Sequence, residues 1–160
     1  GLFDSGNPMQ AAFVGGGKVF QSRLVKKDKY YRLYAALCAR PNGNRVVYSD
    51  DFGRTWYALG GASALPAPGG DEPKCEELPD GRVILSSRVA GGRIYNIFSY
   101  TDILAAEGEW GSSVKSTFEG AGHNAGSNST NGEILIDKRG TAEIPAVIPI
   151  YFGQNFQSIA

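Results

Sequence analysis

Short runs of β-forming residues separated by two-residue turn signals are the feature that most constrains how this chain can fold. Asn42-Gly43 and Asp80-Gly81 each lie between two such runs, and these dipeptides favour the tight turn of an antiparallel hairpin. Glycine contributes 22 of the 160 residues and supplies the backbone freedom that many tight turns need. The pattern predicts an all-β fold built from consecutive antiparallel hairpins.

Most of the chain has strand character, and one short segment has helical character. The strand-like segments are residues 18–25, 30–39, 45–49, 75–78, 82–87, 93–101, 114–118, 133–136 and 146–151. Residues 102–108 are the only helix-like stretch. No linker divides the chain, so we expect a single domain over residues 1–160.

The composition argues against several classes of partner. Lysine and arginine together number 16, as do aspartate and glutamate, so the formal net charge is zero and a nucleic-acid partner has no electrostatic support. No run approaches the roughly 20 apolar residues that cross a bilayer, so no membrane span is predicted. Cys38 and Cys75 lie in apolar strand-like settings, which favour two buried free thiols over a disulfide. No residue spacing suggests a metal site, and no cofactor is expected.

Residues 49–56 carry the turn motif Ser-x-Asp-x-Gly-x-Thr-Trp directly after a predicted strand. Its defining residues are Ser49, Asp51, Gly53, Thr55 and Trp56. The Asp51 carboxylate can accept from loop N–H groups, Gly53 can supply a positive φ, and Trp56 can pack back across the hairpin. This motif is the Asp box, and here the chain resembles the sialidases and other Asp-box β-propellers. In such folds the Asp box is structural and lies on the far side from the active site.

Residues 71–102 resemble the central region of bacterial sialidases. There, a Glu in an Asp-Glu-Pro-like start precedes an Arg at the end of the next strand. Glu72 and Arg88 have this order and stand 16 residues apart, as in the family. The turn at residues 77–82 matches as well, and the whole resemblance runs from about residue 19 to residue 135.

The resemblance implies both a fold and an activity. The fold is a β-propeller of four-stranded blades, of which residues 1–160 would supply about three to four at roughly 40 to 50 residues per blade. The chain would then be part of the catalytic domain of a longer enzyme, truncated at both ends. The implied activity is that of an exo-α-sialidase, which releases terminal sialic acid from glycoconjugates with retention through a tyrosine nucleophile outside this chain.

The resemblance also implies roles for two residues. Arg88 would bind the sialic acid carboxylate, as the second of the family's three arginines. Glu72 would be the general base of the tyrosine nucleophile. The implied partners are sialylated glycans, and the implied location is secreted, periplasmic or at the cell surface.

Other interpretations stay open from the residues alone. Glu72 is otherwise an ordinary turn acid and Arg88 a solvated strand arginine. Arg93 and Asn96 lie close enough in sequence to border the same cleft, although Arg93 can equally be a surface neighbour of Arg88. For the chain as a whole, the alternative to an enzyme is a non-catalytic sialoglycan-binding propeller fragment or a purely structural one.

Two further acids, Glu76 and Glu77, invite an acid–base role. Adjacent strand residues face opposite sides, so at most one of the two can join a shared site. Solvated carboxylates are the favoured interpretation of both.

The rest of the family's catalytic site is not found in this sequence. The segments with the first arginine and the general-acid aspartate are missing, and the third arginine and the nucleophile would lie well beyond Arg88. Arg139 sits in a polar turn outside any matching motif, and Tyr151 is too near Arg88 to be the nucleophile. His123, the only histidine, lies in a polar loop that favours a surface position. We therefore expect the isolated chain to be inactive.

Overall fold

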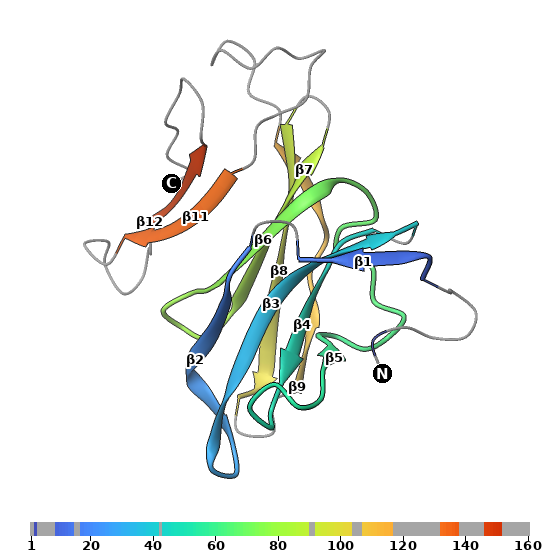
Figure 1. Ribbon diagram of the computed structural model, residues 1–160. Coiled ribbons are helices and arrows are strands. Elements are labelled where there is room, and N and C mark those ends of the chain that lie inside the picture. Colours follow the sequence, from blue (N-terminus) through green and yellow to red (C-terminus); the bar gives the residue numbers. More distant parts are fainter. Residues whose placement is uncertain are drawn as a thin grey trace.

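The computed structural model describes residues 2, 9–14, 17–41, 43–89, 92–103, 107–116, 132–137 and 146–151. Over these residues the chain forms antiparallel strands and no helix (Figure 1). The all-β prediction is therefore confirmed.

The first sheet contains five strands from the N-terminal part of the chain. These are β1 (Ala11–Phe13), β2 (Val19–Lys27), β3 (Tyr30–Arg40), β4 (Arg45–Ser49) and β5 (Tyr57–Ala58). Strands β2 to β5 pair with one another in chain order, each antiparallel to the next. Strand β1 pairs with the last residues of β3. The first sheet is thus an up-and-down meander with one short additional strand.

The second sheet repeats this arrangement. It contains β6 (Asp71–Glu77), β7 (Val83–Val89), β8 (Gly92–Asp102), β9 (Glu107–Trp110) and β10 (Val114–Ser116). Strands β6 to β9 pair in chain order, and β10 pairs with the beginning of β8. A hairpin of β11 (Gly132–Asp137) and β12 (Ala146–Tyr151) follows.

The strand prediction differs from the structure in several strands and in the helical segment. Strands β1, β5 and β9 were not predicted, and β6 begins four residues earlier than expected. The helix predicted over residues 102–108 is wrong, because Asp102 ends β8 and Glu107 begins β9, and these two residues are cross-strand partners. Ladder pairing along β8 therefore outweighs the weak local helical preference.

The two sheets pack face to face through alternating side chains. Val83 and Leu85 of β7 belong to the main core with Tyr34 and Val46 of the first sheet, whereas Ile84 faces the other way. Burying Val83 and Leu85 contributes about 2 kcal/mol each. Because the opposite face of the second sheet is apolar as well, it packs against β11 through Ile134. The second sheet is therefore a middle layer with two buried faces.

A buried polar network also joins the two sheets. Arg32 of β3 forms a bidentate pair with Asp50, with two N···O distances of 2.7 Å, and donates to the Tyr100 hydroxyl of β8 at 3.2 Å. The hydroxyls of Tyr34 and Tyr100 share a short hydrogen bond. Burial raises the pKa of both tyrosines, so both hydroxyls keep their protons over the physiological pH range.

Cys38 and Cys75 are both buried, and neither forms a disulfide. The prediction of two buried thiols is confirmed.

Candidate functional site

The Asp box forms the closed turn that its sequence predicts. Asp51 accepts from the backbone N–H of Thr55 at 2.8 Å and from the Thr55 hydroxyl at 2.7 Å. Gly53 has a φ of 87°, and its N–H donates to Ser49 Oγ at 2.8 Å. The Trp56 indole donates to the Gly53 carbonyl at 3.1 Å and packs on the outer face of the first sheet. Every defining residue of the motif thus has a role within the turn itself.

The pH dependence of stability tests the ionised state of Asp51. Hydrogen bonds from the side chain and the backbone of Thr55 lower the pKa of Asp51 to about 2. Because the pKa is depressed in the folded state, this stabilisation is fully present above about pH 5 and is lost as the pH falls towards 2. We expect the urea midpoint of the wild type to approach that of Asp51→Asn between pH 5 and pH 2. A difference between the two that stays constant down to pH 2 would contradict this assignment.

Glu72 and Arg88 come together at one end of the second sheet. Nη1 of Arg88 lies 3.0 Å from Oε2 of Glu72, and the two side chains are 23% and 30% exposed, respectively. The Oε2 atom of Glu72 is itself buried, yet it accepts no hydrogen bond from the described part of the chain. The contact is therefore an ion pair without hydrogen-bond alignment, which leaves acceptor capacity on the Glu72 carboxylate.

A β-bulge places Glu72 beside Arg88. Asp71 pairs with Arg88 and Lys74 pairs with Ser86, so β6 holds one residue more than β7 over this interval. Glu72 has a φ of 39°, which is uncommon for a non-glycine residue and more so before a proline. Bulges of this kind re-aim a side chain and recur next to active sites. The sequence spacing alone does not reveal the bulge.

Two residues that the sequence interpretation missed complete the cluster. Arg40 ends β3 and lies 3.1 Å from Oδ2 of Asp71 through Nη2, while its Nη1 donates to the Gly70 carbonyl at 2.7 Å. Nη2 of Arg88 lies 3.7 Å from the same Asp71 oxygen. Two arginines from different sheets therefore flank one carboxylate. The only sequence signal for Arg40 is a charge at the end of a long apolar strand, directly before Pro41.

The charge state of Asp71 follows from its neighbours. Burial raises the pKa of Asp71, but hydrogen bonds from the Glu72 N–H and the Cys38 thiol, with the charges of Arg40 and Arg88, outweigh it. The net pKa lies below the usual aspartate value, so Asp71 is ionised at neutral pH. The cluster thus holds two guanidinium groups and two carboxylates.

Gly70, directly before β6, lies close against the neighbouring strand β7. Its φ is 99°, and a side chain there would collide with the Arg88 carbonyl and with Ser87 Oγ. Only glycine satisfies both conditions. Gly70 therefore permits the backbone of β7 to pass close to the carbonyl that holds Arg40.

Arg93 and Asn96 do not share one environment. Arg93 is a cross-strand partner of Arg88, so the two side chains leave the same face of the sheet. Arg93 is buried and donates to Ser86 Oγ at 2.6 Å, so the interpretation of it as a surface residue is wrong. Asn96 points to the opposite face, where its amide donates to the Pro66 carbonyl at 3.0 Å. Asn96 therefore has a structural role.

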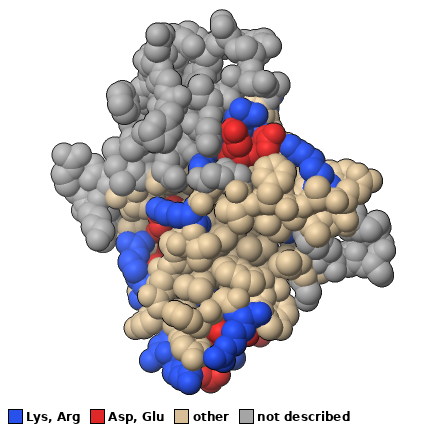
Figure 2. Space-filling model, in the orientation of Figure 1, with Lys and Arg blue, Asp and Glu red and all other residues tan. Residues whose placement is uncertain are grey.

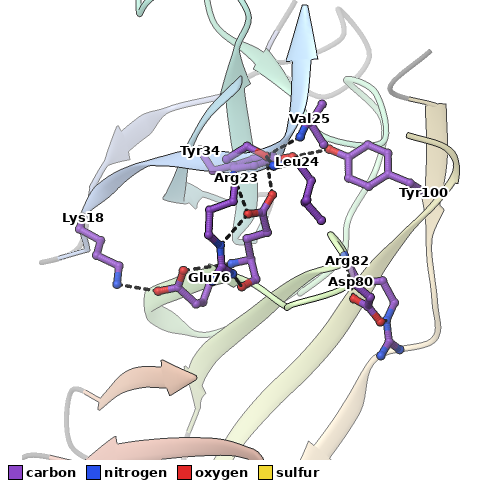
Figure 3. A network of polar contacts seen from close by, with 11 residues as sticks. Lys18, Arg23, Leu24, Val25, Tyr34, Glu76, Asp80, Arg82 and Tyr100 are labelled. Carbon is purple, nitrogen blue, oxygen red and sulfur yellow. Dashed lines mark hydrogen bonds and ion pairs between the residues drawn. The ribbon is translucent and has the colours of Figure 1, made fainter. Parts of the chain in front are cut away.

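Glu76 and Glu77 both contact residues from the N-terminal part of the chain, and Figure 3 labels Glu76 beside Lys18. Glu76 forms an ion pair with Lys18 at 2.6 Å. Glu77 is buried and accepts from the backbone N–H of Arg23 at 2.8 Å and from the Ser22 hydroxyl. The expectation of a solvated carboxylate is wrong for Glu77, because β2 of the other sheet supplies its partners.

The charged cluster and the Asp box lie at opposite ends of the sheets. Ser49, which begins the Asp box, pairs with Leu33, whereas Arg40 lies seven residues further along β3. At 3.3 Å per residue this separation is about 23 Å. Figure 1 shows β3 running upwards and β4 returning downwards, and Figure 2 shows charged atoms near both ends of the described surface and along one side of it.

Some predicted features lie outside the described residues. His123, Arg139 and the side chain of Tyr151 are among them. Within the described ranges, no group of histidine, cysteine or acidic side chains is placed to hold a metal ion. A search of the same ranges finds no helix long and apolar enough to cross a membrane.

Comparisons with known proteins give no relative. A scan against protein-family models finds no match, and searches of curated proteins and of solved structures also find none.

Proposed function

We propose that this chain is part of an exo-α-sialidase, a glycoside hydrolase that releases terminal sialic acid from glycoconjugates. The observation that carries the proposal is the convergence of Glu72 and Arg88, with 3.0 Å between Oε2 and Nη1, at the sheet end opposite the Asp box. The macromolecular substrate would make the protein secreted, periplasmic or surface-bound.

In this proposal Arg88 binds the carboxylate on the anomeric carbon of sialic acid. A guanidinium presents two parallel N–H donors that match a carboxylate, which an ammonium group cannot reproduce. The Arg88 side chain is 23% exposed, so part of it is accessible to a ligand. The arginine therefore suits a bound anion.

Glu72 acts in this proposal as the general base of a tyrosine nucleophile outside this chain. A phenol with a pKa of about 10 is a poor nucleophile at neutral pH unless a carboxylate takes its proton. A neutral nucleophile is also suitable because a carboxylate would be repelled by the substrate's own negative charge. Oε2 of Glu72 accepts no hydrogen bond from the described residues, so its capacity to accept a proton is not used by them.

The arrangement of the sheets supports a propeller. Two four-stranded antiparallel meanders, β2 to β5 and β6 to β9, stack face to face, and a hairpin packs on the second. A four-stranded antiparallel sheet is the repeating blade of a propeller. In this proposal the described residues form two consecutive blades and part of a third, of the about three to four that the resemblance implies for residues 1–160.

Release of sialic acid from a fluorogenic sialoside tests the proposal. The extended chain is defined as these 160 residues with the sequence that adjoins them at both ends. We expect release by the extended chain, with an α-configured first product by NMR, and none by the 160-residue chain. An extended chain that binds sialic acid without releasing it would be a sialoglycan-binding propeller. An extended chain that neither binds nor releases sialic acid would resemble the sialidases in fold alone.

A further inference from the structure

The carboxylate of Asp71 lies between two guanidinium groups that come from different sheets. Its Oδ2 atom is 3.1 Å from Nη2 of Arg40 on β3 and 3.7 Å from Nη2 of Arg88 on β7. The protein's own side chain thus demonstrates that Arg40 and Arg88 can converge on a single carboxylate oxygen.

We propose that Arg40 is a second carboxylate-binding arginine of this site, and that Asp71 occupies the Arg40–Arg88 clamp until a substrate carboxylate competes for it. The inference rests on the proposed function and adds a residue to the same site. Arg40 is not part of the sequence motifs, since it lies 32 residues before Glu72 in the other sheet.

The Arg40 guanidinium is held in place by a hydrogen bond, yet much of its side chain remains exposed. Its Nη1 donates to the Gly70 carbonyl, which fixes the plane of the guanidinium, and its side chain remains 42% exposed. A preorganised arginine loses little side-chain entropy when it binds an anion. Arg40 is therefore both accessible and oriented.

The hold of Asp71 on Arg88 is weak. The separation of 3.7 Å exceeds hydrogen-bond distance, so Asp71 contributes charge to Arg88 without satisfying its N–H. Asp71 is instead held from its other oxygen, which accepts from the Glu72 N–H at 3.0 Å. An incoming carboxylate can therefore bind Arg88 without breaking a formed hydrogen bond to Asp71.

Asp71 offsets the attraction of the clamp for anions. Opposite charges at these distances interact strongly, although solvent exposure screens the effect. Asp71→Asn removes the negative charge and keeps an oxygen for the Glu72 N–H. It should therefore tighten the binding of a carboxylate ligand and leave a neutral ligand unaffected.

Calorimetric titration of the extended chain with N-acetylneuraminic acid and with its uncharged methyl ester tests the proposal. For the acid we expect about tenfold tighter binding with Asp71→Asn and about tenfold weaker binding with Arg40→Ala, the size of one partly screened charge contact. The double variant should lose the gain of Asp71→Asn. The affinity for the methyl ester should be the same in all four proteins.

The matched controls are Asp80→Asn and Arg82→Ala. These residues form an exposed ion pair at 2.7 Å, and the Arg82 side chain is 40% exposed, close to the value for Arg40. Neither variant should change the affinity for the acid or the affinity for the methyl ester. If Arg40→Ala does not fold, Arg40→Lys keeps the charge without the fork and should weaken binding of the acid by a smaller factor.

The outcomes separate the inference from the proposed function. Binding of the acid that is lost with Arg88→Ala but unchanged in the Arg40 and Asp71 variants would overturn the clamp and leave the proposed function standing. An extended chain with no affinity for the acid would overturn both.

Discussion

Glu72→Gln in the extended chain is expected to lower kcat for sialic acid release by about 10²- to 10⁴-fold, the usual contribution of a general base. Glutamine keeps the shape of the side chain and a hydrogen-bonding oxygen, but it cannot accept the proton of the nucleophilic tyrosine in the proposed mechanism. In the proposed mechanism Arg88 still binds the substrate carboxylate, so KM should change little. Steady-state kinetics on a fluorogenic sialoside measures both parameters.

Glu76→Gln is the matched control for this substitution. Glu76 lies on the same strand and is also ion-paired, to Lys18 at 2.6 Å, but it belongs to the inter-sheet contacts. We expect its kcat to equal that of the wild type. Equal kcat values for Glu72→Gln and Glu76→Gln would remove Glu72 from the mechanism, whatever their effect on stability.

The largest expected effect on stability comes from Arg32→Ala. The Arg32 side chain is 4% exposed, forms a bidentate pair with Asp50, and lies over the Tyr48 ring with 3.8 Å to its centroid. Removing one partner of such a pair leaves the charge of the other uncompensated, so we expect a loss of about 3 kcal/mol in the free energy of unfolding. Urea denaturation followed by tryptophan fluorescence measures this loss.

Arg82→Ala provides the contrast for Arg32. Its ion pair with Asp80 has the same distance of 2.7 Å, but both side chains are exposed, and such pairs contribute about 0–1 kcal/mol. Similar costs for Arg32→Ala and Arg82→Ala would mean that burial of the Arg32 pair does not matter. Arg32→Lys, which keeps the charge but not the fork, should fall between them.

The Asp box could be predicted in detail because its contacts are local. Asp51 and Thr55 are four residues apart, and Gly53 lies between them, so the turn is specified within a single short segment. The central strands could be predicted for the same reason, since alternation and turn residues act over short distances. The helix prediction for residues 102–108 failed because the structure of this segment depends on pairing between β8 and β9.

The candidate site could be predicted only in part. Glu72 and Arg88 were found through the order and spacing of a motif, and the structure brings their side chains together through a bulge that no spacing reveals. Arg40 was missed, because its contact with Asp71 joins residues from two sheets. Glu77 was misjudged, because its partner Ser22 lies 55 residues earlier in the chain.

The sequence by itself determined the central strands, the turns between them and the closed Asp box, because hydrogen bonds and backbone preferences within a few residues decide them. The tertiary structure decided which charges meet. The stacking of two meanders buries Glu77 and Arg32 against partners from the other sheet, and it carries Arg40 to the carboxylate of Asp71. A charge is stabilised or exposed according to what lies within a few ångströms of it, and those neighbours come from distant parts of the chain.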